Sequence, residues 1–545
     1  MPGLTLDKVN ESTPLLVNST PVDSSNTPNN KTMAQQTTTA TEDNSLDQSA
    51  SSHSGGAAGE STELRPMNEN ANPVGKSNLI LLVCVAAATA ATLGYDVGIM
   101  AAAIQPLEDQ LQLSGVQKEI AMGSLNFVAA FGAFLGGHVA DKYGRKRTIS
   151  LCCWLFVVGT IAMAASWSYA VLLVGRIITG LGVGVAFVAA PCYITEVAPT
   201  NSRGQLNTVF DISINGGILV GYITGFLVQL FLPDNWRLML GCGLILPLIV
   251  LYLLSRLPES PRWFMLQHRK EEAESVLLHL GNTTAETQQI LQDMHDEIER
   301  EEHATAPMFS HGQLYAIQLG FWQQITGTEA VLYYSADYLE RAGLESPLMR
   351  LGGNVFVGIC KLLPECIAMQ YIDTAGRRPL LFGSATMLFL TTLSLSYAFS
   401  FEANPIVIVV LLCAVMASFS AGLGPFTFLS ASENLAMAER ARGMTLCSAA
   451  NRLTSGTVAM TAVSLTNKVG DAGLFGLYAA AGFFSLFFYW YVPETAGISL
   501  EELAARSQSY GAHDDESKIH HHPHEHHAAP DNMPTSPYTD RGEMA

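Results

Sequence analysis

The chain has 545 residues, of which 48% are hydrophobic and only 14% are charged. This composition and a positive mean hydropathy exclude a soluble protein of this length and predict a polytopic membrane protein. The formal net charge of −19 comes from acidic residues in the two tails and the central loop, where it favours solubility and indicates no nucleic-acid partner.

The nine cysteines predict neither disulfides nor a metal centre. Most of them lie within apolar runs, and no two have the paired Cys-x-x-Cys spacing of a metal or redox site. We interpret them as small core residues. The sequence therefore predicts no metal and no cofactor.

The first 77 residues form a polar tail. They are rich in Ser, Thr, Asn and Pro and lack both apolar periodicity and the pattern of a cleaved signal, so we expect disorder. Residues 11–16 resemble an acidic dileucine sorting signal, which would direct the protein to a vacuolar or endosomal membrane. Because such short matches often arise by chance, we favour the plasma membrane and keep this alternative open.

Twelve apolar runs follow the tail, each near the length of about 20 residues that crosses roughly 30 Å of hydrocarbon. They lie at 79–103, 119–139, 148–166, 169–192, 207–231, 238–257, 313–336, 351–372, 379–399, 405–430, 442–466 and 472–492. Short loops after the second, fourth, eighth and tenth runs carry Lys and Arg, which mark the cytoplasmic side. Both tails are therefore predicted to be cytoplasmic.

One loop motif occurs twice and divides the chain into halves. The pattern Asp-x-x-Gly-Arg follows the second run at 141–145 and the eighth run at 373–377. Two six-helix halves with matching loops predict a duplicated transporter with an all-α membrane fold. The predicted segments are a tail at 1–77, a six-helix bundle at 78–257, a loop at 258–311, a second bundle at 312–492 and a tail at 493–545.

The segments outside the bundles carry short helical patterns. Residues 268–306 are charged, with apolar positions at helical spacing, which predicts amphipathic helices on the cytoplasmic face. Ser499 begins a capping pattern for a short helix after the last span. The His-rich residues 520–527 are candidate zinc ligands, but the absence of any fixed geometry favours a solvated tail.

The seventh run contains a polar segment at residues 320–334, with two amides, two phenols and the carboxylate of Glu329. A charge at the midplane of the membrane costs about 2.5–3.5 kcal/mol on insertion scales, so Glu329 requires a partner, a proton or a water-filled cavity. Gly327 and Thr328 would let the helix break, as helices do at the binding sites of transporters. We interpret this segment as the substrate-facing helix of a transport protein.

With these motifs the sequence resembles the sugar porter family of the major facilitator superfamily, from about residue 79 to residue 503. The motifs that carry the resemblance are Gly94-Tyr95-Asp96, residues 141–145, Gly175-Arg176, Pro191-x-Tyr193-x-x-Glu196, residues 258–262, Gln323-Gln324, residues 373–378, Gly424-Pro425 and residues 493–495. The resemblance implies two six-helix bundles around a central cavity, with alternating access to a monosaccharide-like substrate.

Five positions depart together from the pattern of the glucose carriers. They are Asp211, Glu329, Lys361, Phe428 and Arg452, in the fifth, seventh, eighth, tenth and eleventh spans. The acids in the fifth and seventh spans, Lys361 and the motif Asn-Arg-x-Thr-Ser-Gly at 451–456 resemble the plant-type polyol/monosaccharide transporter branch, which moves linear polyols, inositol and monosaccharides with protons. The match is partial, because this chain has Asp211 where that branch has Glu and Glu329 where it has Asp.

The resemblance implies a substrate site. Its candidate residues are Asp211, Gln323, Gln324, Glu329, Tyr333, Lys361, Phe428 and Asn451. Polyols present many hydroxyl donors and acceptors, which charged side chains bind by the stronger, charge-assisted hydrogen bonds. Alternatively, Glu329, Lys361 and Glu365 form a purely structural ladder, and the aromatic residues only pack helices together.

Asp96 in the first span and Arg176 in the fourth are the candidates for proton coupling. A nearby guanidinium favours the charged form of a carboxylate and desolvation opposes it, so movement of Arg176 would load or release a proton. Facilitative members of the family commonly lack the acid at this position. We therefore favour symport over a structural ion pair in a facilitative hexose uniporter.

Charged residues at the cytoplasmic ends of spans are the candidates for an inner gate. They are Asp141, Arg145, Glu196, Arg203, Asp373, Arg377 and Glu433. The matching acids favour an ion-pair network that closes this gate in the outward-open state. The alternative is that the basic residues only satisfy the positive-inside rule.

Two other functional classes stay open. A nutrient sensor would signal without transport, but such sensors usually carry long structured tails, and both tails here are predicted to be disordered. An organic-cation carrier is suggested by Asp96, Asp211 and Glu329, although Lys361 and Arg452 offset that acidity. No nucleophile-base or metal spacing indicates an enzyme. We expect a monomer in the lipid bilayer that binds a proton and a polyol or monosaccharide.

Overall fold

The computed structural model describes residues 73–197, 203–303, 310–435 and 437–495. Within these ranges the protein is helical apart from short connections, and no strand occurs. The predicted sorting signal at 11–16, the helix start at Ser499 and the His-rich tract at 520–527 lie outside the described residues.

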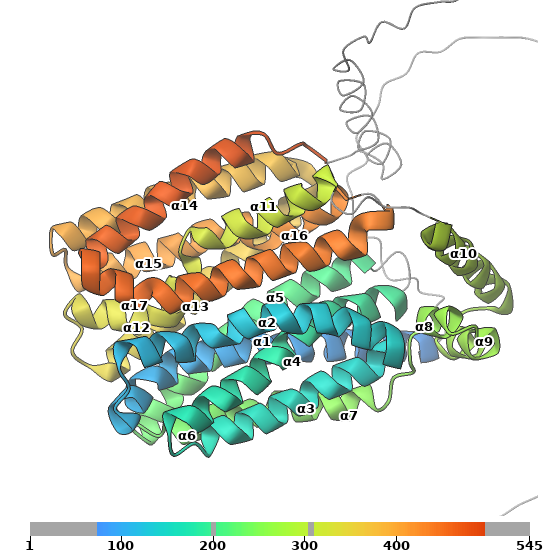
Figure 1. The fold of residues 1–545 in the computed structure, drawn as a ribbon, viewed down its shortest axis with the longest axis horizontal. Helices are drawn as coiled ribbons and strands as arrows, with labels where there is room; N and C mark the ends of the chain where they lie inside the picture. Colours follow the sequence, from blue (N-terminus) through green and yellow to red (C-terminus); the bar gives the residue numbers. More distant parts are fainter. Residues whose placement is uncertain (1–72, 198–202, 304–309, 436, 496–545) are drawn as a thin grey trace, which may run out of the picture. The chain divides into compact units, whose positions relative to one another are not determined.

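The first half forms six spans that run side by side in Figure 1. Its helices are α1 (Pro73–Leu111), α2 (Gly115–Tyr143), α3 (Arg145–Ala164), α4 (Tyr169–Val197), α5 (Arg203–Phe231), and a sixth span made of α6 (Trp236–Gly241), the 3-10 turn η2 (Cys242–Leu244) and α7 (Ile245–Leu254). α1 packs along α5, while α2 and α3 both pack along α4.

The second half repeats this layout with more interruptions. Its helices are α11 (His311–Ile325), α12 (Thr328–Arg341), α13 (Pro347–Ala375), α14 (Arg377–Ser400), α15 (Pro405–Ser420), α16 (Leu423–Glu433) and α17 (Met437–Trp490). α17 holds two spans, because the backbone turns at Gly470, where φ is 75°. Its apolar part of 51 residues is also far longer than one crossing needs.

This arrangement confirms the predicted fold of twelve spans in two six-helix bundles. Ten helices in the described ranges are long and apolar enough to cross a membrane. One of these ten contains two spans, divided at Gly470. α11 and α12 together supply the remaining span, because each half alone is too short to cross.

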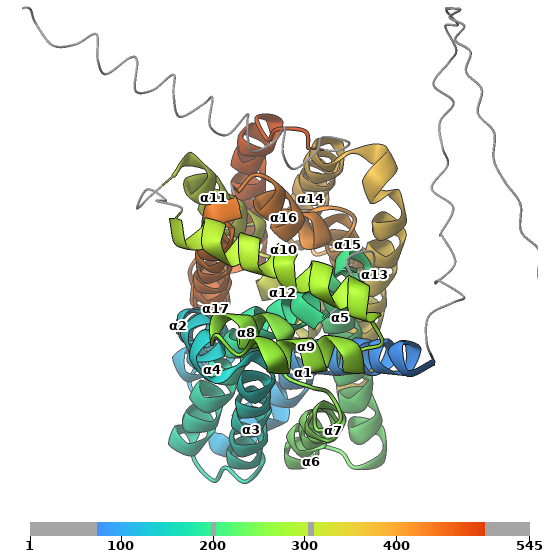
Figure 2. The same ribbon diagram turned by 90° about the vertical axis from the view of Figure 1, so that its right-hand side faces the viewer.

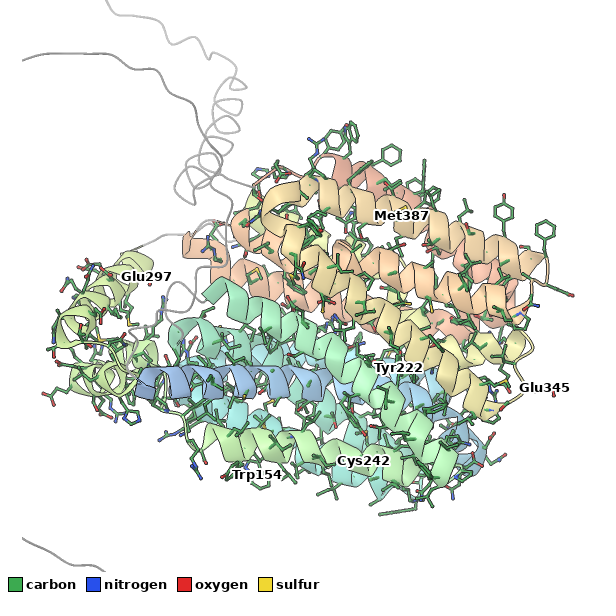
Figure 3. All side chains as sticks on the ribbon, turned by 180° about the vertical axis from the view of Figure 1, so that it is seen from behind. Trp154, Tyr222, Cys242, Glu297, Glu345 and Met387 are labelled. Atoms are coloured by element: carbon green, nitrogen blue, oxygen red, sulfur yellow. The ribbon has the colours of Figure 1, made fainter. Side chains whose placement is uncertain are left out.

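The outer surface of the bundles carries large apolar side chains. Trp154 on α3 and Met387 on α14 are each 54% exposed, and Figure 3 marks both of them. Tyr222, also marked there, is buried between the helices. Exposed apolar side chains of this size suit contact with hydrocarbon, as expected for an integral, multi-pass membrane protein.

Three short helices connect the halves: α8 (Pro261–Leu266), α9 (Lys270–His279) and α10 (Thr284–His303). Figure 2 shows α10 running across the ends of the spans. α9 and α10 bury a small apolar cluster of their own, formed by Ala273, Leu277 and Leu291. The amphipathic helices predicted in this loop are therefore present.

α2 and α4 approach closely because small residues face each other. A methyl group added at Gly132 would lie 2.7 Å from the carbonyl oxygen of Leu181 and 3.1 Å from the Cα of Gly184. Small residues that let backbones approach are typical of helix interfaces in membranes, where lipid tails are as apolar as leucine. Gly137, on the same helix, has open space around its Cβ position.

We expect Gly132→Ala to destabilise the protein by about 1–3 kcal/mol, the usual cost of overpacking, and Gly137→Ala to cause no loss of stability. Thermal unfolding of the purified protein in detergent measures both effects. Both substitutions replace glycine by alanine within α2, so both gain the same helix propensity. A difference between their unfolding midpoints therefore reports packing. Equal unfolding midpoints would contradict the close packing of α2 on α4.

Candidate functional site

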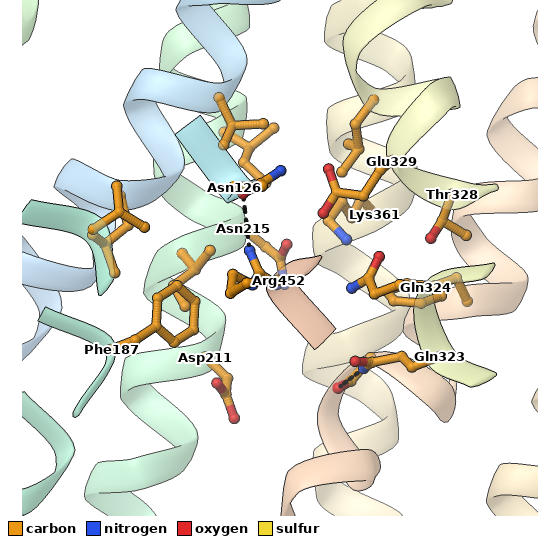
Figure 4. A pocket seen from close by; sticks show the side chains of 18 of the residues that line it. Asn126, Phe187, Asp211, Asn215, Gln323, Gln324, Thr328, Glu329, Lys361 and Arg452 are labelled. Atoms are coloured by element: carbon orange, nitrogen blue, oxygen red, sulfur yellow. Dashed lines mark hydrogen bonds between the residues drawn. The ribbon is translucent and has the colours of Figure 1, made fainter. Parts of the chain in front are cut away.

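A central cavity lies between the two bundles, and helices of both line it (Figure 4). Its polar lining residues are Asn126, Asp211, Asn215, Gln323, Gln324, Thr328, Glu329, Lys361, Glu365 and Arg452. Phe187, Phe419 and Phe428 add aromatic surface. Amides and charges on a partly apolar wall suit a small, strongly hydrogen-bonding ligand.

The predicted helix break is present and positions Glu329. α11 ends at Ile325 and α12 begins at Thr328, with Gly327 between them at φ 86°. Glycine takes this left-handed conformation without steric cost, whereas other residues are strained there. The ring of Tyr478 also packs where a side chain at position 327 would project. Glu329 therefore lies in the first turn of α12, where the helix dipole favours a carboxylate.

Gln323 connects this break to a second one, between α15 and α16. Its Nε2 donates to the carbonyl oxygens of Leu423 (2.7 Å) and Gly424 (3.1 Å), at the start of α16. Its Oε1 accepts from Nδ2 of Asn451 on α17. One amide thus holds α11, α16 and α17 together beside the cavity.

Glu329 and Lys361 both line the cavity, but no ion pair joins them. Oε2 of Glu329 is buried without a hydrogen-bond partner among the described residues. The ammonium of Lys361 lies 4.7 Å from the centre of the Phe419 ring, a cation–π contact. Glu365 instead accepts from Nδ2 of Asn215 on α5. The structural ladder of Glu329, Lys361 and Glu365 is therefore not formed in this structure.

Two predicted substrate residues lie behind the cavity wall. Asn451 is fully buried, and its Oδ1 accepts from Nη2 of Arg452 at 2.6 Å. Tyr333 is also fully buried, with its hydroxyl 3.4 Å from Nδ2 of Asn126. Neighbouring polar groups already occupy both side chains, so we remove them from the candidate substrate contacts. Arg452 reaches the cavity in their place.

The remaining predicted substrate residues do line the cavity. They are Asp211, Gln323, Gln324, Glu329, Lys361 and Phe428. Sequence reasoning did not name Asn126, Asn215, Thr328, Phe187 and Phe419, and it named Arg452 and Glu365 without predicting that they contact the substrate. A usable signal existed for two of them, because Asn215 follows Asp211 and Glu365 follows Lys361 by four positions. That spacing puts each pair on one helix face.

Asp96 and Arg176 meet next to the cavity. Oδ2 of Asp96 lies 2.6 Å from Nη1 of Arg176, which is fully buried. Arg176 also donates to the carbonyl oxygens of Ala121 (2.8 Å) and Met122 (3.0 Å) on α2. The ion pair joins α1 to α4, and the two backbone hydrogen bonds of Arg176 join α4 to α2. Asp96 is next in sequence to Val97, which lines the cavity.

A charged cluster stands at the end of the first bundle that the sequence predicts to be cytoplasmic. Nε of Arg145 lies 2.9 Å from Oε2 of Glu196, which accepts from the hydroxyl of Ser260 at 2.6 Å. Asp141 adds an exposed carboxylate, with its Oδ1 3.1 Å from Nη2 of Arg145. The end of α2, the start of α3, the end of α4 and the start of α8 are thereby linked.

The second bundle has the matching cluster. Nη2 of Arg377 lies 3.1 Å from Oε1 of Glu433, whose Oε2 accepts from the hydroxyl of Thr495 at 2.5 Å. The side chains of Arg203 and Asp373 lie outside the described residues. The Arg145 and Arg377 ion pairs each join helices of one bundle, so neither of them joins the two bundles in this structure.

Sequence reasoning did not assign a role to the glutamate in the Pro-Glu-Ser/Thr motif that ends each half. Oε1 of Glu259 accepts from the backbone N–H of Lys146 at 2.8 Å, at the start of α3. Oε1 of Glu494 accepts from the backbone N–H of Arg377 at 2.9 Å, at the start of α14. Carboxylates at helix N-termini are stabilised by the free N–H groups and the helix dipole. The motif occurs at the end of both halves, and this repetition was the feature of the sequence that could have indicated a role for the glutamate.

Comparisons with known proteins agree with this architecture. A family model described as "Sugar (and other) transporter" matches residues 82–506. Putative polyol transporter 2 of Arabidopsis thaliana is 34% identical over 482 residues, which cover 82% of this chain and 94% of that protein. The galactose-proton symporter of Escherichia coli K12 is 32% identical over 465 residues, which cover 82% of this chain and all of that protein.

Solved structures of similar shape include the xylose transporter XylE from E. coli in an inward open conformation. It has 27% sequence identity and a TM-score of 0.69, with 78% of this chain and 99% of that chain covered. The proton:xylose symporter XylE bound to 6-bromo-6-deoxy-D-glucose has 25% identity and a TM-score of 0.68, with 79% and 99% covered.

We expect Gln323→Leu to destabilise the protein by about 1–3 kcal/mol, because the amide of the buried Asn451 loses its partner. Gln324→Leu is the matched control, since Gln324 makes no hydrogen bond among the described residues and its Oε1 is buried without a partner. Thermal unfolding of both purified variants in detergent, without substrate, makes the comparison. A loss of stability in Gln324→Leu as large as in Gln323→Leu would contradict this assignment.

Proposed function

This chain belongs to the sugar (and other) transporter family, and from that premise we propose that it carries a polyol or monosaccharide across the membrane by alternating access. Transport is coupled to proton entry in the same direction. The similarity to polyol transporters of Arabidopsis thaliana and to a galactose-proton symporter of Escherichia coli supports both parts of the proposal.

The observation that carries the proposal is the presence of two buried charges at the cavity that are in no ion pair among the described residues. Glu329 and Lys361 are only 7% and 5% exposed; Oε2 of Glu329 has no hydrogen-bond partner among those residues, and the ammonium of Lys361 contacts the ring of Phe419. A buried charge without a hydrogen-bond partner is costly, so a ligand that bonds to both is strongly favoured. The carboxylate accepts hydrogen bonds and the ammonium donates them, and the hydroxyls of a polyol do both.

The rest of the cavity suits the same ligand class. Gln324 and Thr328 border the two charges and add neutral donors and acceptors. Phe419 and Phe428 offer flat apolar surface for the C–H faces of a polyol or sugar. An organic cation would fit the carboxylates, but Lys361 and Arg452 line the same cavity and oppose it.

We assign the transported proton to Asp96. Protonation removes the charge that attracts Arg176 and thereby releases α1 from α4, while Val97 transmits the movement to the cavity wall. One proton that enters down 100 mV supplies about 2.3 kcal/mol, and one pH unit adds about 1.4 kcal/mol. Together they sustain a solute gradient of several hundredfold.

We assign the inner gate to the clusters around Arg145 and Arg377. Their shared design, an arginine with a glutamate from the same bundle, supports a matched role in the two halves. When the bundles close on the cytoplasmic side, the two clusters approach each other and exclude water from the cavity.

We propose that one chain is sufficient for transport and that it works in the plasma membrane. Both walls of the cavity come from the same chain, so a second copy has no residue to supply. The vacuolar or endosomal membrane is the alternative location, and a fluorescent fusion with and without residues 11–16 distinguishes the two.

We expect Asp96→Asn to abolish concentrative uptake and substrate-evoked alkalinisation of the medium, because an amide carries no transported proton, while exchange of preloaded substrate continues. Yeast cells that lack their own hexose carriers provide the assay, with mannitol, sorbitol, myo-inositol, glucose, fructose and xylose as substrates. Asp109→Asn, exposed on the same helix, is the matched control. Alkalinisation that persists in Asp96→Asn would contradict the assignment, and uptake without alkalinisation in the parent would mean a uniporter.

We expect Lys361→Met to raise the dissociation constant of the best substrate at least about tenfold, since a charge-assisted hydrogen bond contributes about 1.5–3 kcal/mol. Binding of radiolabelled substrate to purified protein in detergent measures this change. Lys270→Met removes an exposed ammonium on α9 and is expected to leave binding unchanged. An unaltered dissociation constant in Lys361→Met would remove this residue from the site.

A further inference from the structure

α12, the outer half of the broken seventh span, is bonded to the first bundle at two levels. Near the cavity, the carbonyl oxygen of Leu332 accepts from the hydroxyl of Tyr222 on α5 at 2.7 Å. Further along α12, Oδ2 of Asp337 lies 2.8 Å from Nζ of Lys118. Lys118 belongs to the first turn of α2, at the end opposite the cytoplasmic loop. The first bundle and α12 are therefore joined on the outer side of the cavity.

Lys118 stands between two carboxylates. Its Nζ is 2.6 Å from Oε2 of Glu108 on α1 and 2.8 Å from Oδ2 of Asp337 on α12. The side chains of Lys118 and Asp337 are 8% and 7% exposed, whereas that of Glu108 is 31% exposed. One ammonium thus has a partially exposed partner in its own bundle and a more deeply buried partner in the other bundle.

The two ends of the molecule differ in where their ion pairs lie. On the cytoplasmic side, the pairs of Arg145 and Arg377 each stay within one bundle. On the outer side, Lys118 reaches α12, and the next residue, Glu119, accepts from the backbone N–H of Ser464 on α17 at 2.6 Å. The first turn of α2 therefore connects two helices of the second bundle.

We propose that the Lys118–Asp337 ion pair is the latch of the outer gate. It holds α12 against α2 while the cavity is closed to the outside, and it breaks each time the cavity opens outward. This inference rests on the alternating-access function proposed above. Glu108 makes the step reversible, because Lys118 keeps a carboxylate partner when α12 moves away. A buried charge that loses every partner is strongly destabilising, whereas Lys118 retains Glu108 when Asp337 moves away.

The strength of the latch sets the balance between the two states of the gate. Loss of Asp337 removes the ion pair between α2 and α12 and leaves Lys118 paired with Glu108. Loss of Glu108 removes a contact within one bundle and leaves that ion pair intact. If the Lys118–Asp337 ion pair is the latch, removal of the Asp337 carboxylate shifts the gate toward its open state, whereas removal of the Glu108 carboxylate does not. If the contacts of Lys118 are only structural, the two substitutions have the same effect on the gate.

The test compares Asp337→Asn with Glu108→Gln, each in a chain that carries Leu332→Cys as a reporter on the cavity wall. A charged, membrane-impermeant maleimide is added outside intact cells, and labelling of the chain without the reporter is subtracted to remove the native cysteines. Asp337→Asn is expected to raise the labelling rate at least about fivefold, and Glu108→Gln to change it by less than about twofold. Lys118→Met, which cuts both contacts, is the second variant and is expected to show a rise at least as large.

Unchanged labelling in Asp337→Asn and Lys118→Met, or an equal rise in Glu108→Gln, would overturn the latch. The labelling reports access to the cavity and needs no transported substrate, so its outcome does not depend on which ligand the chain carries. A rise in labelling without uptake of any polyol or sugar would refute the proposed function and support the latch.

Discussion

The cost of placing charge away from water governs this structure. A charged side chain at the centre of a membrane costs at least about 2.5 kcal/mol, and the protein meets that cost by giving its buried charges several partners. Arg176 has Asp96 and two backbone carbonyl oxygens, and Lys118 has two carboxylates. Glu329 and Lys361 depart from this rule, because Oε2 of Glu329 has no hydrogen-bond partner among the described residues and the ammonium of Lys361 contacts the ring of Phe419, and both of them line the central cavity. The departure is what marks the cavity as a binding site.

The two halves share a scaffold but differ where they border the cavity. Arginine, glutamate and a hydroxyl residue recur at matching ends of both bundles with the same contacts. The interruptions beside the cavity, between α11 and α12 and between α15 and α16, both belong to the second half. The ion pair of Asp96 and Arg176 lies on the continuous helices α1 and α4 of the first half. The duplicated fold thus combines a half with continuous helices, which holds the Asp96–Arg176 ion pair, with a broken half that presents backbone and amide groups at the cavity.

Alternating access requires contacts that form and break without leaving charges unpaired. Close glycine contacts such as that of Gly132 with α4 hold a bundle together as one body, so movement concentrates at the interface between bundles. Ion pairs at that interface open at little cost when an alternative partner is near, and Glu108 is such a partner for Lys118. Hydrogen bonds from α12 to α5 and α2 supplement the ion pair on the outer side.

The apolar runs, their lengths and the repeated loop motif were enough to predict twelve spans in two bundles, because the hydrocarbon thickness and the backbone's need for internal hydrogen bonds leave few other solutions. The break before Glu329 also followed from local chemistry, since Gly327 is a residue that tolerates positive φ. The sequence did not predict in full which side chains face the cavity. Tyr333 and Asn451 lie behind its wall and Asn126 and Arg452 lie on it, because helical periodicity defines a face but not the neighbour that the face meets. That choice depends on how helices far apart in the chain rotate and pack, and the same packing brings Lys118 to Asp337 across more than 200 residues.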